Sequence, residues 1–224
     1  MCGRFAFYSP SEATAALFGV ENAPPVEPRY NIAPTQYIAA IRDADSGSRE
    51  LKMLRWGLVP FWAKDPSIGN RMINARAETV AEKPSFRSAF KKRRCLILAD
   101  GFYEWHTEAG VKTPYFISAA DSEPFAFAGL WEDWKDKQTG ESLQTATIIT
   151  TPANSFMESL HHRMPVILQR DTAAVWLDGK QDLLQDVPAI TPKLRAWPVA
   201  RTVNNARNEG EDLLAPAGDT RVEG

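Results

Sequence analysis

Short apolar runs recur along the chain and are separated by polar or proline-containing loops. Runs of this length, rich in β-branched and aromatic residues and bounded by turn residues, are typical of β-strands. The runs that predict strands are 37–41, 51–60, 94–105, 113–119, 124–132, 145–151 and 164–169. No internal repeat stands out among them.

Helical patterns are fewer and short. Residues 9–19 predict a helix with Ser9 as its N-cap and Gly19 at its end, and residues 85–92 and 171–179 predict two further brief helices. This order of elements lacks the regular strand–helix alternation of a doubly wound sheet.

The pattern as a whole predicts a single α+β domain with a mostly antiparallel, barrel-like β-sheet core and short peripheral helices. We expect this domain to span residues 1–214. Residues 215–224 are mostly small or polar, and we expect them to form a flexible C-terminal tail.

The composition narrows the class of protein. The 224 residues are 44% hydrophobic and 24% charged, and the apolar runs are too short to span a bilayer. No basic region followed by an apolar stretch marks a secretory signal. The two cysteines, Cys2 and Cys95, match neither a metal-binding nor a disulfide spacing, so we expect a cytoplasmic protein with no membrane role.

Several common functions lack their sequence signatures. The chain has no phosphate-binding glycine loop, no dinucleotide fingerprint, no HExxH motif and no GxSxG elbow. We therefore expect no small-molecule cofactor and no metal. The formal net charge of −2 does not by itself indicate a nucleic-acid-binding protein.

A cysteine at position 2 can have unusual reactivity. If Met1 is removed, Cys2 carries an α-amine and a thiol on adjacent carbons, a pair of nucleophiles that no internal cysteine offers. An α-amine has a pKa of about 7.7–8.0, so a useful fraction is neutral and nucleophilic near neutral pH.

Two stretches gather polar side chains if they are extended. Alternation in "MINARAET" places Asn74, Arg76 and Glu78 on one face, which taken alone favours a solvated strand with an ion pair. Alternation in "ADGFYEWH" places Glu104 beside Phe102. A carboxylate between aromatic side chains is a candidate for a raised pKa and for acid–base catalysis, although an exposed strand glutamate fits equally well.

The remaining candidates are a histidine pair, exposed aromatics and a basic run. In "SLHHRMPVIL" one histidine suits a proton shuttle, with Arg163 beside it to hold an anion, and no third ligand supports a zinc site. Trp62 lies in a loop, where it is a candidate platform for stacking on a base. Residues 87–94, "RSAFKKRR", suit phosphate contacts or a solvated helix face.

Eight stretches in order resemble one family along nearly the whole chain, from residue 2 to about 210. They are "MCGRF", "RYNIAPT", "RWGLVPFWA", "INARAET", "ADGFYEW", "FAGLWE", "TTPAN" and "HHRMPVIL". They resemble the SRAP family, the SOS-response-associated peptidases, also called abasic-site processing proteins. The resemblance implies a monomeric partner of single-stranded DNA that contains abasic sites, acting in the DNA-damage and SOS response.

The resemblance also implies a chemistry. It implies that Met1 is lost by the protein's own action, as in other family members. The amine and thiol of the new N-terminal cysteine then add to the ring-opened aldehyde of an abasic site, and the resulting thiazolidine joins protein to DNA.

The resemblance also assigns roles to the residues that stand at the family's motif positions. The resemblance makes Cys2, Asn74, Glu104 and His161 the catalytic residues: Asn74 positions the N-terminal residue and the lesion, while Glu104 and His161 move protons. It makes Arg4, Trp62, Arg76 and Arg163 the DNA-binding residues. Ala63 departs from the pattern, because some relatives have a second aromatic residue there.

Two other functions remain open from the sequence alone. Glutamine amidotransferases of the N-terminal-nucleophile class also begin Met-Cys-Gly and use Cys2 against an amide. A noncatalytic module that binds single-stranded DNA would use the same basic and aromatic residues without needing Cys2.

Overall fold

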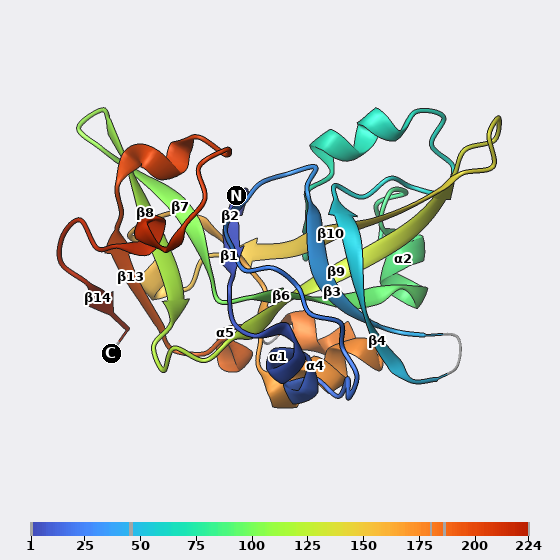
Figure 1. The fold of residues 1–224 in the computed structure, drawn as a ribbon, viewed down its shortest axis with the longest axis horizontal. Coiled ribbons are helices and arrows are strands. Elements are labelled where there is room, and N and C mark those ends of the chain that lie inside the picture. The colour runs from blue at the N-terminus through green and yellow to red at the C-terminus, as the bar shows by residue number, and fades with distance from the viewer. Residues whose placement is uncertain (1, 45–46, 180, 186, 224) are drawn as a thin grey trace.

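The computed structural model describes residues 2–44, 47–179, 181–185 and 187–223. Figure 1 shows two bodies of β-structure side by side, with the N-terminus between them. One is a closed barrel and the other an open sheet, and both are mostly antiparallel. The expected α+β domain with a barrel-like core is confirmed.

The barrel is a ring of paired strands, β10–β4–β3–β6–β9, that closes because β9 pairs back with β10. Only the β4–β10 contact within this ring is parallel. The strands of the ring are β3 (Tyr37–Asp43), β4 (Arg49–Trp56), β6 (Arg94–Ala99), β9 (Phe125–Lys135) and β10 (Ser142–Pro152). Shorter strands extend it: β5 (Asn74–Arg76) and β11 (Arg163–Pro165) pair with β10, and β12 (Ile167–Leu168) pairs with β9.

The open sheet has the strand order β14-β13-β8-β7-β1-β2. Its strands are β1 (Phe5–Phe7), β2 (Arg29–Ile32), β7 (Gly101–Glu108), β8 (Val111–Ala119), β13 (Leu194–Pro198) and β14 (Arg221–Val222). The N-terminal strand is therefore a strand of this sheet, and it pairs with β7 and β2.

The helices are short and peripheral, as expected. They are α1 (Ser11–Leu17), α2 (Arg87–Lys92), α3 (Ser155–Glu158), α4 (Arg170–Leu177) and α5 (Val187–Ile190), with 3₁₀ turns η1 (Pro66–Arg71), η2 (Gln181–Gln185), η3 (Arg201–Asn204) and η4 (Glu211–Leu214). In Figure 1, α1 and α4 lie together at the lower edge of the molecule and α2 lies on the barrel side.

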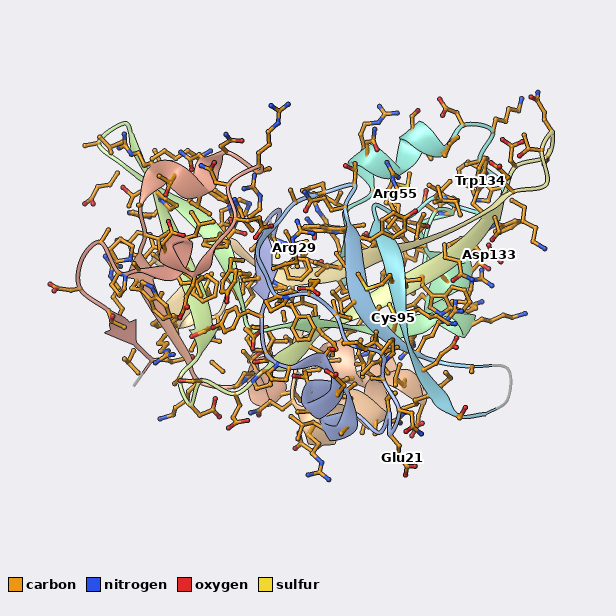
Figure 2. The ribbon with its side chains drawn as sticks, in the orientation of Figure 1. Glu21, Arg29, Arg55, Cys95, Asp133 and Trp134 are labelled. Carbon is orange, nitrogen blue, oxygen red and sulfur yellow. The ribbon has the colours of Figure 1, made fainter. Side chains whose placement is uncertain are left out.

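One buried core joins the two bodies. The ring of Phe5 from the open sheet packs edge-on against Trp56 and Phe127 of the barrel, with centroids 5.2 and 5.5 Å apart. Side chains fill the space between the strands in Figure 2, where Cys95 lies inside the molecule. Such aromatic contacts stabilise beyond their buried area and fix how the two bodies meet.

The run 94–105, predicted as one strand, forms two strands in different bodies. β6 ends at Ala99 in the barrel and β7 begins at Gly101 in the open sheet. A Cβ at Gly101 would lie 2.3 Å from the Phe116 ring and 2.6 Å from the Ile117 carbonyl oxygen, so only glycine fits at this crossing.

The N-cap prediction for the first helix was wrong. The residue at the N-cap position of α1 is Pro10, and no side chain caps the helix. The Ser9 hydroxyl and backbone N–H instead donate to the Asp100 carboxylate, which fixes α1 against the crossing between β6 and β7. The end at Gly19 is confirmed by its left-handed φ of +85°.

The C-terminal segment runs along the open sheet. β14 pairs with β13, and the Glu223 carboxylate accepts from the Leu194 backbone N–H at 3.0 Å. The segment predicted as a tail therefore contains an edge strand, and how flexible it is stays a prediction.

Candidate active site

Cys2 is fully buried where the barrel meets the open sheet. Its carbonyl oxygen accepts a hydrogen bond from the Asn74 side-chain amide at 2.9 Å. Asn74 is the first residue of β5, which runs parallel to β10 with Asn74 in register with Ile148. This pairing places Asn74 beside the segment that precedes β1. Asn74 thus holds the backbone of the cysteine that the sequence singled out.

Glu104 approaches from the open sheet. Both faces of β7 are covered at this point, and Glu104 is only 3% exposed. Burial raises its pKa, so the carboxyl group keeps a proton to a higher pH than an exposed glutamate does. An acid–base group held in this way can exchange protons nearer to neutrality.

His161 faces Glu104 across the junction, with its Nε2 atom 4.0 Å from the Glu104 Oε2 atom. The Arg163 backbone N–H donates to the other ring nitrogen, Nδ1, at 3.0 Å. The Arg163 carbonyl oxygen also lies 3.1 Å from Nδ1, so the Arg163 backbone holds this side of the ring whichever nitrogen carries the proton, and Nε2 faces the carboxylate. Burial lowers the pKa of His161, which favours the neutral ring.

The neighbouring His162 is exposed and stacks on His161, with ring centroids 4.4 Å apart. The stacked ring covers one side of His161 without entering the buried site. The choice of His161 over His162 therefore agrees with burial and with contact to Glu104.

The Cys2 thiol is protonated in this arrangement. Burial raises its pKa, and the Glu104 carboxylate raises it further, while the Arg4 backbone N–H works against them. The four residues predicted as catalytic thus lie together: Asn74 touches Cys2, His161 faces Glu104, and the Glu104 charge acts on the Cys2 sulfur.

Arg163 is engaged within the protein. Its guanidinium donates to both carboxylate oxygens of Glu78 and to the carbonyl and hydroxyl oxygens of Thr150, at 2.8 and 3.3 Å for the latter two. The sequence placed Glu78 on the face of Asn74 and Arg76 but gave no signal that Arg163 would reach it, because the partners are 85 residues apart.

Arg4 is also engaged. One guanidinium nitrogen donates to the Asn31 side chain and to the Val203 carbonyl, both at 2.7 Å, and the group lies 5.9 Å from the Trp105 ring centroid. Asn31 is fully buried, and its amide donates to the carbonyl oxygens of Val203, Asn205 and Asn208. Sequence reasoning missed Asn31. Its place in "RYNIAPT" is the only signal that could have pointed to it.

Arg76 and Trp62 are the exposed members of the predicted DNA-binding set. Within the described ranges, the Arg76 side chain makes no hydrogen bond or ion pair. Trp62 is 44% exposed and its neighbour Phe61 is 55% exposed, whereas Ala63 is buried against Val59 and Trp134. The second exposed aromatic of this loop therefore precedes Trp62 instead of following it.

The basic run 87–94 is divided by the fold. Arg87, Lys91 and Lys92 are exposed on α2. Arg93 pairs with Glu132 at 2.8 Å, and Arg94 lies buried between the Phe90 and Trp176 rings, each 4.4 Å away. This run is therefore partly structural.

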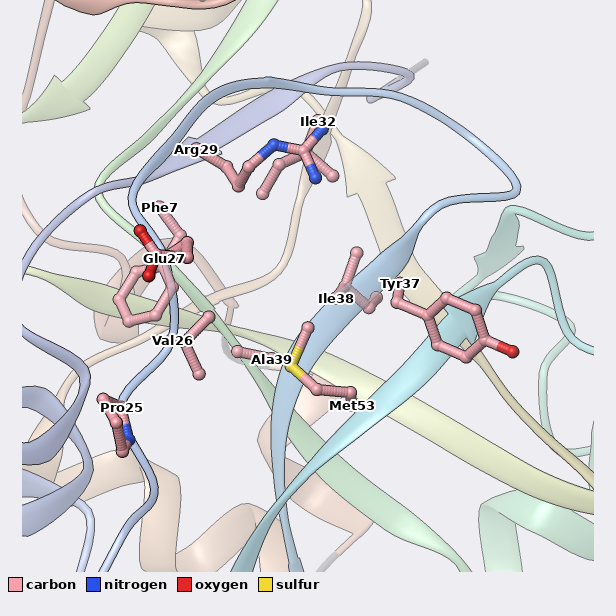
Figure 3. Close-up of a pocket in the computed structure, with 10 residues that line it drawn as sticks. All are labelled: Phe7, Pro25, Val26, Glu27, Arg29, Ile32, Tyr37, Ile38, Ala39 and Met53. Atoms are coloured by element: carbon pink, nitrogen blue, oxygen red, sulfur yellow. The ribbon is translucent and has the colours of Figure 1, made fainter.

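A separate groove of about 300 Å³ lies between β1, β2 and the start of β3 and contains no predicted site residue (Figure 3). Its lining is mainly apolar, with Val26, Ile38 and Met53 along it and Glu27 and Arg29 as the charged groups.

Neither a membrane-spanning helix nor a metal-binding cluster occurs among the described residues. None of the helices there is long and apolar enough to cross a membrane. In the same part of the chain, no group of three histidine, cysteine, aspartate or glutamate side chains is placed to hold a metal ion.

Comparisons with known proteins agree on one relationship. The chain is 45% identical over 223 residues to the abasic site processing protein YoaM of Bacillus subtilis, which covers 96% of this chain and 97% of that protein. It is 34% identical to the abasic site processing protein HMCES of Xenopus tropicalis, over 84% of this chain and 66% of that protein.

Among solved structures, a protein from Bacteroides thetaiotaomicron superposes with a TM-score of 0.84 at 28% identity, over 96% of this chain and all of that one. The model of the family described as SOS response associated peptidase (SRAP) matches residues 1–206. The chain therefore belongs to the SRAP family.

Proposed function

We propose that this protein processes abasic sites in single-stranded DNA by a covalent reaction at Cys2. The observation that carries the proposal is the convergence of Asn74, Glu104 and His161 on a buried N-terminal cysteine. Family membership supports it, because the relatives named above are abasic site processing proteins. Met1, whose removal the reaction requires, lies outside the described residues.

The proposed reaction begins at the α-amine of Cys2. The amine adds to the aldehyde carbon of the ring-opened abasic sugar, and loss of one water gives a Schiff base. The Cys2 thiol then adds across the carbon–nitrogen double bond: sulfur bonds to the former aldehyde carbon, and its proton passes to nitrogen. The product is a five-membered thiazolidine, and the net change is the loss of one water.

Each neighbouring residue has a role in this sequence. Asn74 holds the Cys2 carbonyl and so orients the amine. Glu104 receives and returns protons as the carbinolamine loses water, because its raised pKa makes it a better proton acceptor than an exposed glutamate. His161 assists opening of the sugar ring by proton transfer through Nε2, the ring nitrogen that faces Glu104.

Binding of DNA is assigned to the surface around this site. Arg76 and Trp62 are exposed and suit a phosphate and an unpaired base. Arg4 and Arg163 lie closer to the buried groups and hold the walls of the site as well. An abasic sugar enters such a site at low cost, since no base has to be unstacked there.

The finer assignments from the sequence are part of the same proposal. They are removal of Met1 by the protein itself, Schiff-base lyase activity as a side path, action as a monomer in the cytoplasm on nucleoid DNA, and a role in the SOS response. The chemical steps among them need only groups of this chain and the aldehyde of the DNA.

A denaturing gel with single-stranded DNA that carries one abasic site tests the proposal. We expect wild type to form a band that survives denaturant, and Cys2→Ala to lose that band while still binding DNA under native conditions. Cys95→Ala is the matched control, because Cys95 is an equally buried free thiol away from the site.

Two outcomes favour the alternatives. Release of ammonia from glutamine, with no DNA adduct, supports an amidotransferase. Identical native binding by wild type and Cys2→Ala, with no denaturant-resistant band from either, supports a noncatalytic binding module.

A further inference from the structure

Arg163 lies beside the candidate active site. Its own backbone N–H braces His161, so it is adjacent to the Glu104–His161 pair. The Arg163 side chain is 11% exposed, while the side chain of Glu78, which it binds, is 45% exposed. The carboxylate therefore lies on the solvent side of the guanidinium.

Three neighbouring strands create this arrangement. Thr150 of β10 pairs with Arg76 of β5 on one side and with Pro165 of β11 on the other. Glu78 follows β5 and Arg163 begins β11, so their side chains meet over the end of β10. Arg76 is close enough for its charge to act on Glu78.

Arg163 has a second anchor. Its Nη2 atom donates to the Thr150 carbonyl at 2.8 Å and contacts the Thr150 hydroxyl at 3.3 Å. These oxygens belong to the barrel and hold the guanidinium from the inner side. Loss of the carboxylate would therefore leave the guanidinium in place with its outer donors open.

A carboxylate and a phosphate bind a guanidinium in the same two-pronged geometry. We propose that Glu78 occupies on Arg163 the position that a phosphate of the DNA strand takes, so that DNA loading exchanges a carboxylate for a phosphate. This inference rests on the proposed function, because it takes single-stranded DNA as the ligand. Glu78 is then the residue that limits affinity for strands without a lesion.

The exchange has a definite electrostatic consequence. Wild type must release the carboxylate and then hold it near the incoming phosphate, where the two negative charges repel each other. A neutral side chain at position 78 removes both costs. Because one more positive charge then faces the strand, salt should weaken the binding more steeply.

The test is equilibrium binding of a lesion-free oligothymidylate, measured by fluorescence anisotropy across a salt series. Glu78→Gln should bind about threefold to tenfold more tightly than wild type at low salt. The slope of log K against log salt should become steeper by about 0.7. In the Arg163→Lys background, which keeps the charge but loses the two-pronged geometry, the gain should shrink to less than about twofold.

Glu82→Gln is the matched control, because Glu82 is exposed in the same segment and makes no contact with Arg163 among the described residues. It should change affinity by less than about twofold, since distant surface charges are screened. Weaker binding by Glu78→Gln, an equal gain in Glu82→Gln, or a full gain in the Arg163→Lys background would overturn the exchange.

The result is separable from the proposed function. Lesion-free DNA cannot form the thiazolidine, so the exchange is judged on noncovalent binding alone. A gain in Glu78→Gln together with no covalent adduct on abasic DNA would support the exchange and reject the chemistry at Cys2. A covalent adduct without any gain in Glu78→Gln would do the reverse.

Discussion

The Nε2 atom of His161 lies 4.0 Å from the Oε2 atom of Glu104, although the two residues come from different β-bodies. Glu104 belongs to the open sheet, and His161 lies two residues before β11, which pairs with barrel strand β10. The distance exceeds that of a hydrogen bond, and such catalytic contacts often tighten when substrate binds. The chemistry therefore depends on how closely the barrel and the open sheet pack.

Glu104→Gln should slow covalent adduct formation about 100-fold, because the amide cannot exchange protons and this class of catalysis contributes about 10²–10⁴-fold. Denaturing gels over time measure the rate. Native DNA binding should stay within about twofold of wild type. An unchanged rate would remove Glu104 from the mechanism.

The same substitution should stabilise the protein, and more so at higher pH. The pKa of Glu104 is raised in the folded state, so folding binds its proton more tightly than the unfolded chain does. Stability from this group is highest below the ordinary glutamate pKa of about 4.3 and falls as pH rises through the window up to the folded pKa. The Tm difference between Glu104→Gln and wild type should grow from pH 5 to pH 8, and a constant difference would contradict the assignment.

Asn74→Ala should slow adduct formation about tenfold or more while leaving native DNA binding within about twofold. The variant loses the hydrogen bond that orients the Cys2 carbonyl, and a lost bond of this kind costs about 1–2 kcal/mol. Rate and affinity measured on the same preparation separate the two effects. A loss confined to affinity would show that Asn74 serves DNA instead of Cys2.

Asn31→Ala should lower stability by about 3 kcal/mol and the Tm by about 5–15 °C, because the buried amide bonds Arg4 and carbonyls of the 203–208 segment. Calorimetry measures both quantities. Asn31→Asp is the comparison variant, since it keeps the acceptor for Arg4 but loses the donors. A Tm within 2 °C of wild type for Asn31→Ala would refute this role.

Gly57→Ala should cost about 3 kcal/mol or more and also slow adduct formation. Gly57 has a φ of +124°, and a Cβ there would lie 2.5 Å from the Gly69 carbonyl oxygen. This contact closes the loop that leads through Met72 to Asn74. Gly140→Ala is the control, because Gly140 also has a positive φ but nothing lies within 4 Å of its Cβ position, so it should cost only about 1 kcal/mol.

Trp62→Ala should weaken native binding of single-stranded DNA about fivefold or more, the usual loss for one base stack. Trp62 and Phe61 occupy the centre of a turn closed by the Ala63 N–H and the Pro60 carbonyl, which keeps both rings exposed. Tyr37→Ala is the matched control, since Tyr37 is as exposed as Phe61 but lies on β3 beside the groove. Equal losses in both variants would indicate a general surface effect.

Local pattern was enough to predict most of the barrel. The barrel strands within 37–41 and 145–151, and the open-sheet strand within 113–119, have strong β-propensity and clear boundaries, and all are confirmed. β1 and β13 were not predicted, because "FAF" and "LRAWP" are too short or too mixed to stand out. β1 pairs with β7 and β13 pairs with β8, so both depend on strands far away along the chain.

In the candidate site too, local patterns could be predicted and long-range contacts could not. Alternation along one strand made Glu104 and Asn74 candidates, because it is a local property, while their roles came from the family resemblance. The partners of Arg4 and Arg163 were out of reach, since Val203 and Glu78 lie 199 and 85 residues away. Contacts of this range come from the topology, which the sequence pattern did not resolve.

The most direct test of the account is the intact mass of the protein after incubation with single-stranded DNA that carries one abasic site. We predict a species with the mass of the protein without Met1 plus the DNA minus one water, formed by wild type and absent from Cys2→Ala. A folded wild-type protein that has lost Met1 and forms no such species would contradict the chemistry proposed for Cys2.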